Sequence, residues 1–230
     1  MIETKGMKPY GCYQTTEGLW VRDKGEEGVR EQQKEWKGLV EVFKDIPCQR
    51  VWDLGAHVGW FTWFANQNLH PNPEILCVEC SPRQVELLQY NMPLNARLLQ
   101  GALVPDSYRG SGVTLWLGKK YSSCDTIQPA KNRRGIYGIR AIKLRDVIKA
   151  MPNPDAIKLD IEGSEYGLDW QNQMPKSVKC LVAELHHPTV IQQVLQSKFQ
   201  QIMIELGFKP VRPAKINTFQ KVCHVRYDRI

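Results

Sequence analysis

The chain has 230 residues, of which 42% are hydrophobic, and a formal net charge of +7. This length suits one globular domain with an adequate core, and the lack of any run of roughly 20 apolar residues excludes a membrane-spanning helix. The moderate basic excess suits an anionic partner, such as a nucleic acid or a phosphorylated substrate, without requiring one.

Residues 1–45 are predicted to form an N-terminal extension that packs on the main domain, residues 46–230. The first segment, MIETKGMKPYG, lacks the apolar stretch of a signal peptide, so we expect a cytoplasmic protein. A polar Thr-Thr-Glu-Gly turn between two apolar stretches indicates a hairpin over Met7–Arg22. Apolar residues at helical spacing then indicate a charged helix over Gly25–Phe43.

The stretch Arg50–Ala65, RVWDLGAHVGWFTWFA, combines a short apolar strand with a helix and places glycines in the turn between them. Its D-x-G-x-x-x-G spacing lacks the central glycine of a dinucleotide fingerprint. Asp53 would repel a phosphate and suits a cationic ligand such as S-adenosylmethionine. A strand–glycine–helix corner can also be purely structural, but we favour a cofactor site. The expected contacts are Asp53, Gly55, Ala56, His57 and Gly59.

A second buried strand, Glu74–Val78, ends at Glu79, where a carboxylate can accept the hydroxyls of a ribose. Cys77 and Cys80 form a C-x-x-C pair here, but no second pair follows at zinc spacing, so we expect reduced thiols. Ser81 and Pro82 favour the start of a helix. After it comes a short strand, Arg97–Leu99. Gly101 and Ala102 follow that strand, where we expect an adenine ring to rest.

The middle of the chain is basic. Two strands, Gly112–Leu117 and Ile136–Ile142, flank a polar loop, and a helix over Leu144–Met151 follows. A patch here could serve an anionic substrate or a nucleic acid. The basic residues concerned are Lys119, Lys120, Lys131, Arg133, Arg134, Arg140, Lys143 and Arg145.

The segment KLDIEGSE follows a fourth strand, Ala156–Leu159, and places three carboxylates around a glycine: Asp160, Glu162 and Glu165. A fifth strand, Lys179–Ala183, is followed by Glu184 and His186. A long helix over Thr189–Leu206 and an antiparallel pair, Phe208–Val211 with Gln220–Tyr227, complete the chain. Alternating strands and helices predict an α/β fold with a mainly parallel sheet.

Three segments together resemble the FkbM-type S-adenosylmethionine-dependent methyltransferases: VWDLGAHVGWFT, VECSPRQVELLQYN and IKLDIEGSEYGL. The resemblance covers about Arg50 to His187, and the third segment is the most specific. It implies a class I methyltransferase (Rossmann-like) fold, with a seven-stranded, mostly parallel sheet and helices on both faces. It also implies methyl transfer to an oxygen of a sugar or small molecule. His57 and Cys80 depart from the family's usual Asn and Pro beside the expected cofactor pocket.

Methyl transfer to a hydroxyl needs alignment of the two reactants and a group that accepts the proton. We predict catalytic roles for Asp160, which also faces the cofactor, for Glu162 and for His186, whose ordinary pKa suits a base at neutral pH. Glu165 is expected to cap a helix, and Glu184 could orient His186. Grouped carboxylates can hold Mg²⁺, but no further acids stand in register, so we assign no metal ligands and keep a metal site as the less favoured alternative.

Three other functions compete with this one. A ribose 2′-O-methyltransferase acting on RNA could use Lys34, Asp160, Lys179 and Glu184, with basic residues contacting phosphates. A non-catalytic module would keep the fold without turnover, although the intact motif residues argue against it. A dehydrogenase is disfavoured by the missing central glycine. We therefore expect a small-molecule or saccharide acceptor, no membrane partner, and leave the oligomeric state open.

Overall fold

A computed structural model of the chain describes residues 11–22, 34, 37–69, 71–118, 125–129, 133–186, 190–211 and 222–230, with the backbone alone for 190–192 and 222–224. Within these ranges, no helix is both long enough and apolar enough to cross a bilayer. The predicted helix over Gly25–Phe43 lies partly outside the described residues, but 37–41 are helical.

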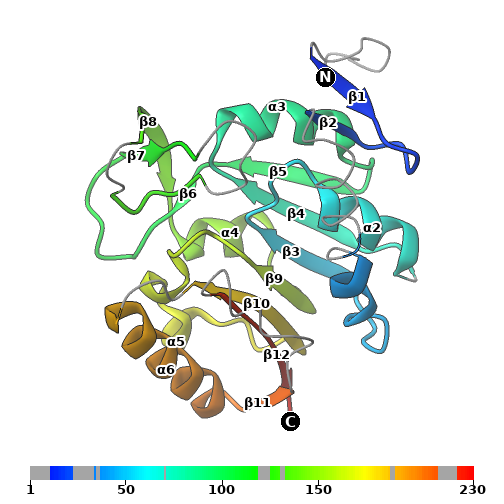
Figure 1. The fold of residues 1–230 in the computed structure, drawn as a ribbon. Helices are drawn as coiled ribbons and strands as arrows, with labels where there is room; N and C mark the ends of the chain where they lie inside the picture. Colours follow the sequence, from blue (N-terminus) through cyan, green and yellow to red (C-terminus); the bar gives the residue numbers. More distant parts are fainter. Residues whose placement is uncertain are drawn as a thin grey trace.

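The main sheet has seven strands in the order β11-β12-β10-β9-β3-β4-β5 (Figure 1). The five strands from β10 to β5 pair in parallel, and β12 runs antiparallel to both of its neighbours, β10 and β11, so six of the seven strands share one direction. The predicted sheet, with its closing antiparallel pair, is thus confirmed. Its strands are β3 (Arg50–Leu54), β4 (Glu74–Glu79), β5 (Ala96–Gln100), β9 (Ala156–Leu159), β10 (Cys180–His186), β11 (Phe208–Val211) and β12 (Val222–Arg229).

Helices cover both faces of this sheet (Figure 1), which explains why its strands are apolar on both sides. In β3, Val51 packs in one buried cluster and Trp52 in the other. The first cluster includes α2 (Trp60–Asn68) and α3 (Pro82–Asn91). The second includes α4 (Leu144–Ala150), α5 (Trp170–Gln173) and α6 (Val190–Glu205).

Two smaller sheets flank the core. The hairpin β1 (Cys12–Gln14) and β2 (Trp20–Arg22) is antiparallel as predicted. It docks on α3, where the side-chain amide of Asn91 bonds both backbone polar groups of Trp20 and Arg22 pairs with Glu86. A three-stranded sheet contains β6 (Ala102–Leu103), β8 (Gly135–Ile142) and β7 (Gly112–Trp116), in that order. Strand β6 was not predicted.

Candidate functional site

The β3–α2 corner is held against the end of β9 through its first glycine. Gly55 has a φ of +86°, and a Cβ atom on it would lie 1.6 Å from the carbonyl oxygen of Asp160. Only glycine lets two backbones approach this closely. Gly59, just before α2, has a φ of +94°, and a Cβ there would lie 2.9 Å from Leu88. The predicted cofactor corner therefore adjoins the predicted catalytic segment.

Backbone N–H groups in the corner bond within the protein. Gly55 and Ala56 both donate to the carbonyl oxygen of Val78, at 2.9 and 3.0 Å, and His57 donates to Oε2 of Glu79 at 2.8 Å. His57 adopts a left-handed conformation, with a φ of 53°. Phosphate-binding corners instead direct such N–H groups at the ligand. In this corner, these three N–H groups are instead bonded within the protein.

Glu79 ends β4 and joins the corner to the start of α3. Its Oε1 accepts hydrogen bonds from the backbone N–H groups of Cys80 and Ser81, and its Oε2 accepts the bond from His57. Burial raises the pKa of Glu79, and these N–H groups oppose the rise. A carboxylate offers about four lone-pair sites, so roughly one is left for a ligand hydroxyl.

Cys80, Gly101 and Ala102 lie together beside the three-stranded sheet. Ala102 is 3% exposed within β6, and Cys80 packs against the same cluster. Gly101 donates its N–H to the carbonyl oxygen of Glu79, and a Cβ on it would lie 2.9 Å from the carbonyl oxygen of Arg140. Gly101 is therefore needed for packing on β8, and a cofactor contact at this point stays a prediction.

Asp53 is fully buried and makes its bonds inside the protein. Its Oδ2 accepts a hydrogen bond from the Thr62 hydroxyl at 2.7 Å, and its Oδ1 lies 3.3 Å from Nζ of Lys158. Lys158 also lies 3.7 Å from Oδ2 of Asp160. Burial lowers the pKa of Lys158, but the two aspartates outweigh burial and raise it, so the side chain is charged at neutral pH. Direct contact of Asp53 with a cofactor stays a prediction.

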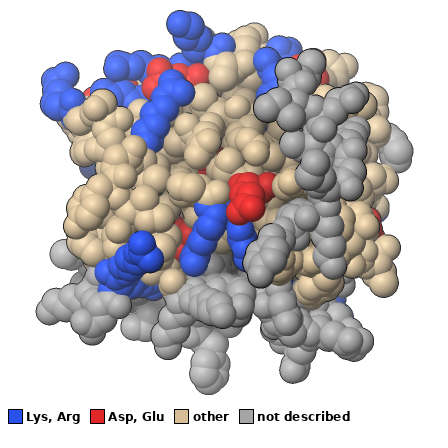
Figure 2. Space-filling view, turned by 90° about the horizontal axis from the view of Figure 1, so that it is seen from above, with Lys and Arg blue, Asp and Glu red and all other residues tan. Residues whose placement is uncertain are grey.

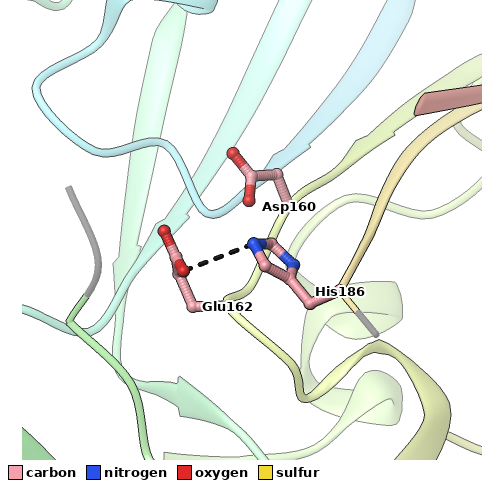
Figure 3. Close-up of side chains that lie close together, drawn as sticks. All are labelled: Asp160, Glu162 and His186. Carbon is pink, nitrogen blue, oxygen red and sulfur yellow. Dashed lines mark ion pairs between the residues drawn. The ribbon is translucent and has the colours of Figure 1, made fainter. Parts of the chain in front are cut away.

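All three residues predicted to be catalytic meet at the carboxyl ends of β9 and β10. Asp160 follows β9, Glu162 lies in the next loop, and His186 ends β10, so the side chains point toward one another (Figure 3). Nε2 of His186 lies 3.3 Å from Oε2 of Glu162. Glu162 has a φ of 55°, a strained conformation of a kind that is found preferentially at functional sites.

Strand β10 is longer than predicted. The sequence placed its end at Ala183, but the structure extends it to His186. The reason is the neighbouring strand, because β10 pairs with β12 as far as His186 opposite Val222. Glu184 and His186 are consequently held in a hydrogen-bonded ladder and do not belong to a loop.

Glu165 lies against the other side of the His186 ring. Its side chain is 0% exposed, and its Oε1 lies 3.2 Å from Nδ1 of His186 while accepting the backbone N–H groups of Ile161 and Gly163. The predicted role as a helix cap is incomplete: Glu165 begins the 3₁₀ helix η1 (Glu165–Gly167), but it also orients the histidine. The Tyr166 hydroxyl fixes the backbone by donating to the carbonyl oxygen of His186.

Among the described residues around His186, carboxylates outnumber cations. This excess of negative charge and the burial of the groups shift their pKa values. Burial and the neighbouring Glu184 raise the pKa of Asp160 well above its ordinary value, and burial also raises that of Glu162. Burial lowers the pKa of His186, but hydrogen bonds with Glu162 and Glu165 outweigh it and raise the pKa of His186 to about 12. The histidine is therefore protonated at neutral pH in this arrangement.

Comparison with known proteins identifies the fold. No protein-family model matches the chain, and no curated protein matches its sequence. A "putative O-methyltransferase" from Klebsiella pneumoniae has a TM-score of 0.53 at 10% identity, over 91% of this chain and 92% of its own. A "putative caffeoyl-CoA O-methyltransferase" from Staphylococcus aureus has a TM-score of 0.51 at 7% identity, over 90% and 93%. A cofactor-bound protein from MTB has a TM-score of 0.54 at 12% identity, over 85% and 79%.

This is the class I methyltransferase fold. At such identities the likeness concerns the fold alone, and the narrower FkbM-type resemblance stays a hypothesis because no family model supports it.

Sequence reasoning missed two members of the site. Lys158 has a signal in the sequence, because a lysine inside the apolar strand Ala156–Leu159 of a class I methyltransferase fold is buried and must find an acidic partner. Glu165 was assigned to a helix end because acids are common there. No sequence signal distinguishes that role from its contact with His186, which depends on how β10 is placed.

The residue set sketched for an RNA methyltransferase is not assembled. Lys179 directly precedes β10 and pairs with Asp155 at 3.0 Å, at the amino edge of the sheet, whereas Asp160 and Glu184 lie at the carboxyl edge. On the face drawn in Figure 2, Lys and Arg side chains stand in separate groups between uncharged areas. Lys119, Lys120 and Lys131 of the predicted basic patch lie outside the described residues.

Proposed function

We propose that this protein transfers a methyl group from S-adenosylmethionine to a hydroxyl group of a sugar or another small molecule. The observation that carries the proposal is the contact of Gly55 with Asp160, because it joins a cofactor-type corner to a cluster of ionisable side chains. In folds of this kind, ligands bind at the carboxyl ends of the strands, where both features lie. The FkbM-type resemblance favours an oxygen acceptor.

The residues around the corner fit this cofactor. Glu79 keeps roughly one acceptor position for a ribose hydroxyl. The acidic surroundings of Asp160 suit a ligand with a sulfonium and an amino group. When bound, S-adenosylmethionine supplies a methyl group that its positive sulfur activates. We assign its site to Asp53 acting through Lys158, and to Gly55, Ala56, His57, Gly59, Glu79, Cys80, Gly101, Ala102 and Asp160.

The cluster has groups for both tasks that a hydroxyl acceptor demands. Asp160 and Glu162 have raised pKa values, which makes them better proton acceptors than ordinary carboxylates. His186 carries a proton at neutral pH, and its two ring N–H groups face Glu165 and Glu162, so it holds the Glu162 carboxylate in place for the acceptor. The predicted role of His186 as the base therefore passes to a carboxylate in this arrangement.

Cofactor binding is tested by calorimetric titration with S-adenosylmethionine and S-adenosylhomocysteine. We expect micromolar-range binding of either compound, and a loss of at least about tenfold in Glu79→Ala, because one hydrogen bond to a charged group contributes about 1.5–3 kcal/mol. Glu74→Ala, at the exposed opposite end of β4, is the matched control. Equal affinity of both variants and the unchanged protein would remove Glu79 from the site.

Turnover is tested by mass spectrometry on a panel of hydroxylated acceptors. Asp160→Asn and His186→Ala should lower the rate by about 10²- to 10⁴-fold, far more than they lower cofactor affinity, because most of the loss falls on proton transfer and orientation. Asp155→Asn, at the other end of β9, is the control. Full activity in the first two variants would contradict their assignment. Salt-sensitive binding of a short RNA in the same samples would revive the nucleic-acid alternative.

A further inference from the structure

We propose that Asp160, Glu162 and His186 bind a single divalent cation of the first transition row. One ligand atom from each of these residues lies within 4.8 Å of the other two. Two ligands on one such ion lie at most about 4.4 Å apart, since each bond measures about 2.0–2.2 Å. Small movements of the side chains therefore suffice, and the pair formed by Nε2 of His186 and Oε2 of Glu162 is already at 3.3 Å.

The histidine is oriented as a metal ligand would be. Oε1 of the fully buried Glu165 lies 3.2 Å from Nδ1 of His186, which leaves Nε2 directed toward Glu162. A carboxylate on the second ring nitrogen is the usual partner of a metal-binding histidine, because it fixes the ring and raises its basicity. The backbone of His186 is held as well, by β12 and by the Tyr166 hydroxyl.

Asp160 supplies an independent observation that points to a ligand. Its Oδ1 is buried and has no hydrogen-bond partner among the described residues, while its Oδ2 lies 3.7 Å from Lys158. A buried carboxylate oxygen without a partner is costly. A cation bound in the cluster would satisfy this oxygen.

The charges and donor types indicate which cation fits. Around the cluster, the ion pairs of the described residues set the carboxylates of Asp53, Asp160, Glu162, Glu165 and Glu184 against two cations, Lys158 and His186. A divalent ion bound there would reduce this excess of negative charge. One imidazole with two carboxylates suits Mn²⁺, Fe²⁺ or Zn²⁺ better than Mg²⁺ or Ca²⁺, which prefer oxygen ligands alone.

Three protein ligands leave coordination positions open for a substrate. An acceptor hydroxyl bound there would lose its proton more readily, because a bound cation lowers the pKa of a coordinated oxygen. This role, unlike the binding site itself, rests on the proposed function. It would replace the need for a free carboxylate base.

The test uses the full chain, stripped with a chelator and titrated with Mn²⁺, with binding followed by electron paramagnetic resonance. We expect one bound Mn²⁺ per chain and magnetic coupling to an imidazole nitrogen, which the unchanged protein can reveal without any variant. Asp160→Asn and His186→Ala should weaken binding by more than about 100-fold, and Glu165→Gln by about 10- to 100-fold. Asp155→Asn should bind as the unchanged protein does.

Each outcome decides the proposal. The proposal is overturned if Mn²⁺ does not bind stoichiometrically or shows no coupling to nitrogen. It is also overturned if Asp160→Asn and His186→Ala bind Mn²⁺ as tightly as the unchanged protein does. Circular dichroism checks that variants fold, and Glu162→Gln is a milder alternative because its side chain is 22% exposed. Binding of S-adenosylmethionine without Mn²⁺ binding would refute the metal site alone. Mn²⁺ binding without affinity for S-adenosylmethionine would refute the proposed function alone.

Discussion

An aspartate lies at each end of strand β9, and the surroundings of the two carboxylates are opposite in character. Before the strand, Oδ2 of Asp155 accepts the backbone N–H groups of Gln49 and Arg50, and its Oδ1 pairs with Lys179 at 3.0 Å. After the strand, Asp160 has a buried oxygen without a hydrogen-bond partner among the described residues. Burial raises both pKa values, but the N–H groups and Lys179 outweigh it at Asp155, whose pKa is lowered, whereas that of Asp160 is raised.

The aspartate before β9 therefore contributes to stability, whereas the aspartate after β9 lies in the candidate site. At the amino edge, both carboxylate oxygens of Asp155 have hydrogen-bond partners, and these bonds link β3, β9 and β10. The carboxyl edge keeps carboxylates in excess, which costs stability and leaves groups able to take up a proton or a cation. Substitutions of the two aspartates should therefore change the free energy of unfolding in opposite directions.

The largest effect is expected from Lys158→Met at the carboxyl edge. Lys158 is 2% exposed and is shared by Asp53 and Asp160, so its loss leaves buried carboxylates without their cation. Breaking a buried pair in this way costs about 3–5 kcal/mol. Urea denaturation measures the free energy of unfolding. A loss below about 1 kcal/mol would mean that the aspartates do not depend on this lysine.

At the amino edge, Asp155→Asn should destabilise by about 1–3 kcal/mol, because hydrogen bonds to a charged group are lost. The lowered pKa in the folded state gives the pH dependence its sign. The carboxylate contributes fully above its unfolded pKa of about 3.9, and its contribution disappears as the pH falls through the lower folded pKa. Denaturation of Asp155→Asn and of the unchanged protein should be measured from about pH 3 to about pH 7. The difference between their free energies of unfolding should shrink as the pH falls.

Asp160→Asn should change stability in the opposite direction, by about +0.5–2 kcal/mol at neutral pH. Because the folded pKa is raised, ionisation of Asp160 opposes folding above the unfolded pKa of about 3.9, and the gain from Asn disappears below it. Thermal unfolding of Asp160→Asn, Asp155→Asn and the unchanged protein shows the direction of both stability changes in one experiment. A destabilised Asp160→Asn protein would show that Lys158 already satisfies this carboxylate.

The smallest effect is expected from Lys179→Met. Its side chain is 51% exposed, so solvent and salt screen its pair with Asp155. Exposed pairs contribute roughly 0–1 kcal/mol. Repeating the denaturation in high salt should abolish even this difference. A loss comparable to that of Asp155→Asn would assign the effect of the aspartate to the ion pair, and not to its backbone contacts.

The sequence predicted the fold better than the connections within the site. Apolar runs and glycine turns follow local rules, so the strands of the main sheet and the position of Asp160 could be found in advance. Lys158 could have been found too, since a lysine in an apolar strand needs an acid. The orientation of His186 could not, because it depends on Glu165 and on the pairing of β10 with a strand much later in the chain.

The late position of β12 also has a consequence for synthesis. Strand β10, which holds Glu184 and His186, has β9 on one side from the start, but its other neighbour begins only at Val222. At ribosomal rates of about 5–20 residues per second, that edge stays open for a few seconds in each nascent chain. An open edge is a site of aberrant pairing between chains. Slow codons ahead of Val222 would therefore lower the yield of folded protein, although they leave its amino-acid sequence unchanged.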